Sequence, residues 1–310
     1  MDLSIVIPVY KSARILPELV DVINRVIPSN VLFELILVND CSPDDSWKVI
    51  CDLAEINPNL IGLNLRKNAG QHNAIMAGLR EASGSIIVTM DDDFQHNPIY
   101  ILDFISAIER GADCCYSRFH KMKQKTWKVL GSRFNGLIAN FLLDKPRDLY
   151  LSSYKAISKE IRDMIIAYNG PYPYVDGLIL LHTDNIVVID IEHQERLIGQ
   201  GNYSFLKSLA LWAMMSTGFS VKPLRLATFL GIGIAFCAFV IALLLIIYKL
   251  AFDVNIQGWT SLSTMVLFMG GVQLIFLGVI GEYIGRSYLT VNHNPQVVIK
   301  EKTTRNHGRI

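Results

Sequence analysis

Three consecutive aspartates, Asp91, Asp92 and Asp93, directly follow an apolar run, and Gln95 stands two residues further on. Adjacent carboxylates repel one another, so a fold accepts them at low cost only at a solvated turn or around a cation. Carboxylate and amide oxygens are hard ligands, which suit Mg²⁺ or Mn²⁺ and do not suit zinc. The spacing therefore predicts a divalent-metal site at Asp91, Asp93 and Gln95, and the alternative is a plain acidic turn.

An open magnesium-type site usually completes its coordination with water and with the phosphates of a substrate. A diphosphate leaving group fits such a site, because the cation stabilises the charge that builds up as the bond breaks. The sequence contains neither a GxGxxG motif after its first apolar run nor a GxxxxGK[ST] motif. A dinucleotide cradle and a P-loop are therefore excluded, and a cation with side chains must hold the phosphates.

Apolar runs that alternate with helical patterns must position these residues. Strands are expected at 3–9, 33–38, 61–65 and 85–90, with helices between them, which is typical of a doubly wound, mostly parallel α/β sheet. Parallel strands place their carboxyl ends at one edge of the sheet, where such folds bind ligands. We expect the residues that follow these strands to converge there: Tyr10, Asp40, the 66–72 loop and the segment 91–95.

Further strands are expected at 113–117, 148–157 and 187–192. Arg118 follows the first of these, and the segment Lys121–Lys128 is basic with interleaved aromatic residues. This basic segment is either a solvated loop or a surface that captures an anion or contacts an anionic membrane.

Hydrophobic residues make up 51% of the chain and are concentrated in its C-terminal third. Residues 203–221 form either an amphipathic helix in a membrane interface or a buried core helix. Residues 226–248 carry no charge and are long enough to span a bilayer, and a second span is expected at about 262–284. Lysine and arginine flank the outer ends of this hairpin, so we expect both termini and the α/β domain in the cytoplasm.

Composition limits the function further. The formal net charge of the 310 residues is +1, which argues against a nucleic-acid partner. The five cysteines are odd in number and lack CxxC spacing, so we expect reduced thiols in a cytosolic domain and no structural zinc.

Six segments together resemble the polyprenyl-phosphate glycosyltransferases: SIVIPVY, VNDCSPD, NAGQHNAIMAG, GSIIVTMDDDFQHNP, HQERLIGQGNYSF and LGVIGEYIGR. These are inverting, family-two enzymes with a GT-A fold, which include dolichol-phosphate mannose synthase. The chain looks most like the undecaprenyl-phosphate aminoarabinose transferase and bactoprenol glucosyltransferase type. The resemblance runs from residue 3 to about 290. It implies a membrane-attached enzyme of the inner membrane that moves a sugar from a nucleotide sugar to undecaprenyl phosphate for cell-envelope modification.

The resemblance also implies roles for particular residues. The implied ligands of the metal, Mg²⁺ or Mn²⁺, are Asp91, Asp93 and Gln95. The residues implied to bind the acceptor phosphate are Arg118, Arg196 and Lys121. Asp93, Arg118 and Arg196 are the implied catalytic set. Nucleotide contacts are implied at Pro8, Tyr10, Asp40, Asn68, Gln71, Asp91 and Asp92. Gly201-Asn202 departs from the Ser-Lys that is usual in the family, which removes one cation from the expected phosphate site.

The predicted organisation is a nucleotide-sugar glycosyltransferase domain over 1–202, an amphipathic helix over 203–223, a transmembrane hairpin over 224–290 and a cytoplasmic tail over 291–310. Membrane lipids are expected partners, and the resemblance implies a homo-oligomer, a tetramer.

Strand alternation would turn Asp92 away from Asp91 and Asp93. Two alternatives remain: a non-catalytic membrane scaffold of the same fold, and a processive polysaccharide synthase, which typically needs more spans than the two expected here.

Overall fold

The computed structural model describes residues 1–119, 149–170, 172–192, 222–252, 258–292 and 295–303. These residues divide into two compact units. The first holds the N-terminal part through residue 192 together with 295–303, and the second holds two long helices. The predicted amphipathic helix at 203–223 lies outside the described residues, apart from its last two positions.

The first unit contains one mixed sheet. Its strands in the described residues are β1 Leu3–Val9, β2 Phe33–Asn39, β3 Leu60–Leu65, β4 Ile86–Thr89, β5 Cys114–Phe119, β6 Lys155–Ser158, β7 Ile186–Ile191 and β8 Ile299–Lys302. Their order across the sheet is β7-β5-β6-β4-β1-β2-β3-β8. β1 pairs in parallel with β2 and β4, as do β2 with β3 and β5 with β7, whereas β6 and β8 run antiparallel to their neighbours. The prediction of a mostly parallel α/β sheet is confirmed.

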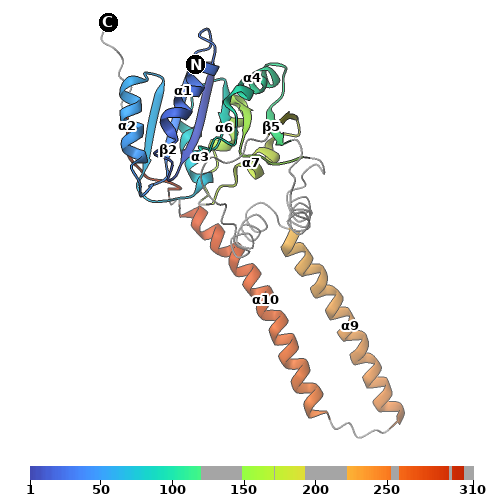
Figure 1. Cartoon of the computed structure of the whole chain (residues 1–310). Helices are drawn as coiled ribbons and strands as arrows, with labels where there is room; N and C mark the ends of the chain where they lie inside the picture. The colour runs from blue at the N-terminus through green and yellow to red at the C-terminus, as the bar shows by residue number, and fades with distance from the viewer. Residues whose placement is uncertain (120–148, 171, 193–221, 253–257, 293–294, 304–310) are drawn as a thin grey trace. The chain divides into compact units, whose positions relative to one another are not determined.

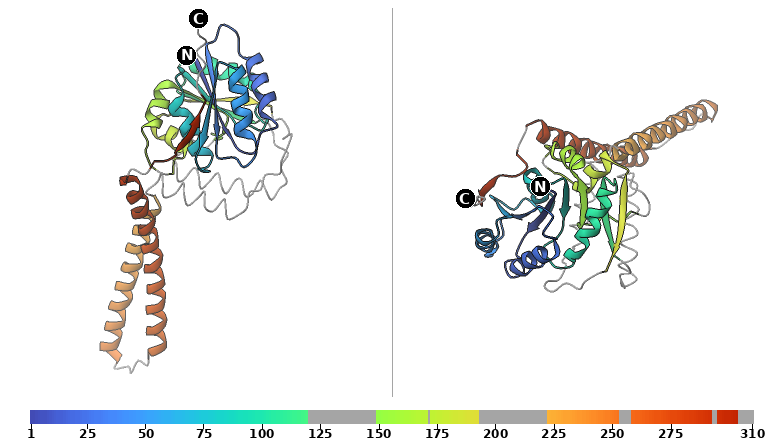
Figure 2. Two further views of the ribbon diagram at one scale, coloured as in Figure 1. Left: turned by 90° about the vertical axis from the view of Figure 1, so that its left-hand side faces the viewer. Right: turned by 90° about the horizontal axis from the view of Figure 1, so that it is seen from above.

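Helices cover both faces of this sheet (Figures 1 and 2). Their bounds are α1 Leu16–Val26, α2 Ser46–Ile56, α3 Gln71–Glu81, the short 3-10 helix η1 Pro98–Tyr100, α4 Ile101–Glu109, α6 Lys159–Ile166 and α7 Val175–His182. Apolar residues of α1, α2 and α4 pack with one face of β1, β2 and β4 in the main core cluster. α3 contacts the opposite face of β1, where a β-carbon added to Gly78 would lie 2.3 Å from Val6 Cγ1. Glycine at this position therefore lets α3 lie close to the sheet.

The chain returns to the sheet after the second unit, which the sequence analysis did not predict. β8 pairs antiparallel with β3 and appears in Figure 2 as the dark red arrow beside the blue strands. Gln296, just before it, is buried. Its side-chain amide donates to the carbonyl oxygens of Tyr168 and Gly170, at 3.0 and 2.5 Å, and its oxygen accepts from Arg80 at 2.7 Å. The predicted cytoplasmic tail thus contributes a strand and a buried polar anchor to the first unit.

The second unit consists of α9 Lys222–Phe252 and α10 Trp259–Val291. Within the described residues, one helical stretch is long and apolar enough to cross a membrane, Phe268–Val291, and α9 contains a shorter apolar stretch, Ala227–Ile241. Most described aliphatic and aromatic side chains along both helices are exposed, which is the surface expected of helices in lipid. The predicted second span, 262–284, overlaps the apolar stretch of α10, and the two-span topology stays a prediction.

Candidate active site

Four loops converge on one cavity at the carboxyl edge of the sheet. Its volume is about 360 Å³, and it is lined by Pro8, Val9, Tyr10, Asp40, Asn68, Gly70, Gln71, Asp91, Asp92 and Asp93. These residues follow or end β1, β2, β3 and β4, so the predicted convergence is confirmed. All seven residues expected to contact a nucleotide are among them.

The three aspartates lie beyond the end of β4 and adopt different environments. Asp91 accepts two side-chain hydrogen bonds, from Gln71 Nε2 and Ser153 Oγ, each at 2.6 Å. Asp92 turns to the loop after β1 and accepts the backbone N–H of Tyr10 at 3.2 Å. Asp93 accepts the backbone N–H of Gln95 at 3.1 Å. All three line the cavity, contrary to the expected orientation of Asp92, because β4 ends at Thr89 and strand alternation does not extend to them.

Burial makes Asp92 a weaker acid than an ordinary aspartate. It raises the pKa of this carboxyl to about 6, although hydrogen bonds from Ser12 and the Tyr10 backbone act in the opposite direction. The neighbouring charges of Asp91 and Asp93 add to the increase. A carboxyl so placed is costly to ionise without a nearby cation.

The donor set fits a hard divalent cation with an open coordination sphere. Asp91 and Asp93 line the cavity, whereas Gln95, the third predicted ligand, belongs to the same turn but is not among the lining residues. Among the described residues, no group of three or more His, Cys, Asp and Glu side chains is arranged to hold a metal by itself. A Mg²⁺ or Mn²⁺ ion here would therefore take water or phosphate oxygens as its remaining ligands, as such ions commonly do.

Asp40 also lines the cavity and orders the loop before α3. It is buried, and its two carboxylate oxygens accept the backbone N–H groups of Ala69 and Gly70, at 2.7 and 2.9 Å. Asn68 donates from its side chain to the Asp40 carbonyl oxygen at 3.2 Å. Gly70 has a φ of +87°, which non-glycine residues rarely adopt, and it immediately precedes α3. Asp40 therefore holds the loop that begins α3, a role that its position after a strand did not reveal.

Backbone strain gathers at the same edge. Within the described residues, the non-glycine residues with positive φ are Lys11, Cys41 and Phe94, at 61°, 51° and 57°. Each lies shortly after the end of β1, β2 or β4. Left-handed conformations of such residues persist only where surrounding contacts enforce them, and they cluster at functional sites. One such contact is the hydrogen bond from the Lys11 backbone N–H to Ser42 Oγ, at 2.7 Å.

Of the three predicted acceptor-phosphate residues, the described structure includes only Arg118. Arg118 lies on β5 and does not line the cavity; it forms a bidentate pair with Asp190 of β7, at 2.7 and 3.0 Å. Both side chains are about half exposed. Lys121 and Arg196 lie outside the described residues.

A buried polar cluster borders the first turn of α3. Lys155 of β6 is 2% exposed and pairs with Asp176 of α7, which also accepts the Tyr116 hydroxyl at 2.9 Å. The ring of His72, the second residue of α3, lies edge-on to Tyr174 with centroids 5.1 Å apart. Burial lowers the pKa of His72 and keeps its imidazole neutral, while the Asp176 charge acts to raise this pKa.

Two residues of the site were missed by sequence reasoning. Ser153 bonds to Asp91 from the segment before β6. His96 accepts the Asp91 backbone N–H at its Nδ1, at 3.2 Å, and stacks on Tyr154 with ring centroids 4.8 Å apart. The position of His96 in the same turn as the aspartates was a usable signal, whereas Ser153 carried none before its pairing partner was known.

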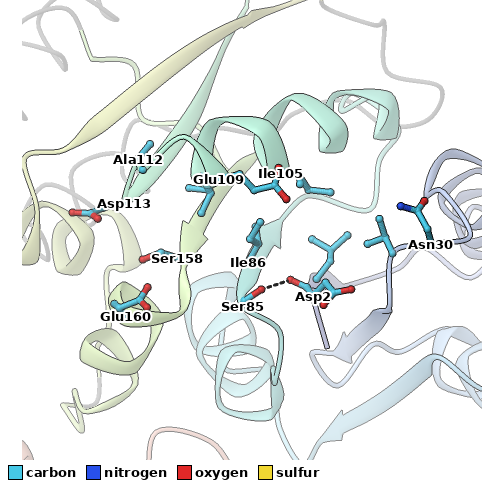
Figure 3. A pocket seen from close by; sticks show the side chains of 14 residues that line it. Asp2, Asn30, Ser85, Ile86, Ile105, Glu109, Ala112, Asp113, Ser158 and Glu160 are labelled. Atoms are coloured by element: carbon cyan, nitrogen blue, oxygen red, sulfur yellow. Dashed lines mark hydrogen bonds between the residues drawn. The ribbon is translucent and has the colours of Figure 1, made fainter.

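A larger cavity, of about 540 Å³, lies at the opposite edge of the sheet (Figure 3). Its lining includes Asp2 at the start of β1, Ser85 at the start of β4, and Glu109 at the end of α4. The Ser85 hydroxyl donates to the Asp2 carbonyl oxygen there, at 2.8 Å. This cavity contains none of the residues predicted from the sequence. The smaller cavity therefore remains the candidate active site, since it brings those residues together.

Comparisons with known proteins identify the family of the chain. The family described as Glycosyl transferase family 2 matches residues 4–166, and the GtrB C-terminal hairpin matches residues 222–287. Undecaprenyl-phosphate 4-deoxy-4-formamido-L-arabinose transferase of Proteus mirabilis is 33% identical over 96% of this chain and 93% of its own. The uncharacterized glycosyltransferase YkcC of Bacillus subtilis is 31% identical over the same shares.

Solved structures resemble the first unit. Glucosyl-3-phosphoglycerate synthase from Mycobacterium tuberculosis, in complex with Mn²⁺, UDP-glucose and phosphoglyceric acid, aligns with a TM-score of 0.52. The alignment covers 69% of this chain and 78% of that one, at 18% identity. The fold is therefore GT-A.

Proposed function

The chain belongs to glycosyl transferase family 2 and is a glycosyltransferase, and we propose that it moves a sugar from a nucleotide sugar to undecaprenyl phosphate at a membrane. The observation that carries the proposal is the combination, in one chain, of an aspartate-lined cavity with a C-terminal hairpin segment. A near-full-length relative is named an undecaprenyl-phosphate sugar transferase. A lipid acceptor lies in the membrane, which explains why the enzyme carries apolar helices; a soluble acceptor would not explain them.

We assign the nucleotide to the cavity formed by Tyr10, Asp40, the 68–71 loop and the aspartates. The amino end of α3 begins at this loop, and the unpaired N–H groups of a helix start favour bound phosphate. Asp91 and Asp93 would hold a divalent cation, which supplies charge stabilisation to the departing diphosphate. Mn²⁺ is the ion present with UDP-glucose in the solved structure described above, and Mg²⁺ has the same ligand preference.

A polyprenyl phosphate is an anion near neutral pH, so it can attack the sugar carbon without a base to remove a proton. It must be oriented and stripped of water, which arginine forks do well. We assign this role to Arg118 and Arg196, with Lys121 contributing charge. Asp190 holds the Arg118 guanidinium in one orientation from the neighbouring strand. Alignment of the phosphate and stabilisation of the leaving group would supply most of the rate.

We place the enzyme in the inner membrane as a two-span protein with its first unit and both termini in the cytoplasm. Lys222 and Arg225 precede the apolar part of α9, and Lys300 and Lys302 follow α10, which is the charge bias of cytoplasmic flanks. The domain limits are proposed at 1–202, 203–223, 224–290 and 291–310. Assembly into a tetramer is proposed from family resemblance alone.

The test is a transfer assay on the full chain purified in detergent from washed membranes. A panel of labelled UDP-, GDP- and dTDP-sugars is incubated with undecaprenyl phosphate and Mn²⁺ or Mg²⁺, and label is counted in the lipid extract. We expect one donor to label the lipid and Asp93→Ala to abolish labelling, while Asp52→Ala, an exposed acid on α2, leaves it unchanged. Failure of every donor with folded protein would favour the scaffold alternative, and full activity of Asp93→Ala would remove the metal assignment.

A further inference from the structure

The carboxylate of Asp91 is held from both sides by neutral donors. Gln71 Nε2 donates to Oδ1 from the first turn of α3, and Ser153 Oγ donates to Oδ2 from the segment before β6, each at 2.6 Å. Two such bonds leave the carboxylate one orientation, because rotation about its side chain would break both. They also leave lone pairs available on each oxygen.

The position of Ser153 follows from the pairing of β4 with β6. These strands run antiparallel, and their last paired residues toward the active-site edge are Thr89 and Lys155. Asp91 lies two residues after Thr89 and Ser153 two residues before Lys155, so the end of this pairing brings the two residues close together. The Thr89 hydroxyl donates to the Ser153 carbonyl oxygen at 2.9 Å, which fixes the backbone that carries the serine. The sheet itself therefore determines where the Ser153 hydroxyl lies.

We propose that Ser153 is a positioning residue for the reaction, which orients Asp91 toward the cation and nucleotide of the cavity. This inference rests on the proposed function and names a residue outside the cavity lining. An open site with few protein ligands depends on each carboxylate being oriented before the cation arrives. Without the Ser153 bond, Oδ2 loses its partner and the side chain gains rotamers that point away from the cavity.

Ser152, the preceding residue, provides a matched comparison. It is buried, and its Oγ accepts hydrogen bonds from Ser117 Oγ at 2.8 Å and from the Tyr154 backbone N–H at 3.2 Å. The first bond joins β5 to the segment before β6, and Asp91 is not among the partners of Ser152 in these bonds. Loss of the Ser152 hydroxyl should therefore lower stability without changing the orientation of Asp91.

The experiment measures binding of UDP, GDP and dTDP, in parallel, to the full chain in detergent by titration calorimetry at increasing Mn²⁺. We expect Ser153→Ala to weaken Mn²⁺-dependent binding by about 10- to 100-fold, the usual effect of removing a hydrogen-bond partner of a metal ligand. Ser153→Thr, which restores a hydroxyl, should bind nearly as wild type does. Ser152→Ala should keep its affinity and show a lower unfolding temperature.

Each outcome has a defined meaning. Equal affinity of Ser153→Ala and wild type, with wild type binding normally, overturns the positioning role and leaves the proposed function intact. A folded wild type that binds none of the three nucleotides with Mn²⁺ overturns both the positioning role and the proposed function. If Ser153→Ala fails to fold, Ser153→Cys, whose thiol is a weak donor of similar size, takes its place. Wild-type affinity in that variant also overturns the role.

Discussion

Replacing Asp40 by asparagine tests whether this carboxylate shapes the cavity through the backbone. Asp40 is 4% exposed, and each of its oxygens accepts one backbone N–H, from Ala69 at 2.7 Å and from Gly70 at 2.9 Å. Asparagine offers one acceptor oxygen and one NH₂ group. One of the two N–H groups therefore loses its acceptor and faces another donor.

The size of the effect follows from the bond that is lost. A hydrogen bond to a charged group contributes about 1.5–3 kcal/mol, and about 1.4 kcal/mol corresponds to a factor of ten in an equilibrium constant. The 68–70 loop should therefore open about 10- to 100-fold more often in the variant. The strands beneath it should be unaffected, because β1 and β2 remain paired along their full length.

Hydrogen–deuterium exchange of the full chain, without nucleotide, measures this opening. We expect the amides of Ala69 and Gly70 to exchange faster in Asp40→Asn by the factor above, and the amides of β1 to keep their rates. Asp45→Asn is the matched control, since Asp45 lies exposed in the same loop after β2 and makes no side-chain capping bond in the described structure.

Unchanged exchange at Ala69 and Gly70 would refute the reasoning. If UDP binding were lost at the same time, Asp40 would act by touching the nucleotide directly. Faster exchange accompanied by weaker binding would instead establish that the loop must be ordered before the nucleotide can bind.

Two further predictions concern the buried cluster beside α3. Lys155→Met should destabilise the first unit by about 3–5 kcal/mol, because it leaves the Asp176 carboxylate buried without its cation; adding Asp176→Asn should recover most of the loss. Thermal unfolding followed by thiol labelling of buried Cys114 and Cys115 measures both, in a background where the more accessible Cys41, Cys51 and Cys237 are replaced by serine. A cost under about 1 kcal/mol would contradict the prediction. His72 has a lowered pKa, so the unfolded chain binds the proton first, and the unfolding free energy should fall as pH drops below the ordinary value of 6.5. His72→Gln should lose less stability over that range, and an equal loss in both proteins would assign the pH dependence to other groups.

The first four strands could be predicted closely because buried strands are rich in apolar and β-branched residues. Leu3–Val9 is mostly of this kind, and the structure gives it the same bounds, buried on both faces. The strand expected at 148–157 was predicted too long, since β6 begins only at Lys155. β8 escaped prediction because Ile299–Lys302 is short, charged and exposed, so only its partner β3 makes it a strand. Its distance in sequence from β3 offers no local signal.

The candidate site likewise has features that could be predicted from the sequence and features that could not. The sequence identified the cavity-lining residues, since polar residues after parallel strands must meet at one edge. It misjudged the orientation of Asp92, because where β4 ends depends on pairing with β1 and β6 and not on the strand's own residues.

By itself, the sequence determined which chemistry is possible: three carboxylates after a strand, arginines further on, and apolar stretches at the C-terminal end. Residue types and their spacing carry that information, because ligand preference and hydrophobic length are properties of the residues alone. Only the tertiary structure decided how each carboxylate is used. Asp91 is held by Gln71 and Ser153, Asp92 by the loop after β1, and Asp40 by the loop before α3. These partners come from different strands and helices, and antiparallel register and loop closure, which no local pattern encodes, bring them together.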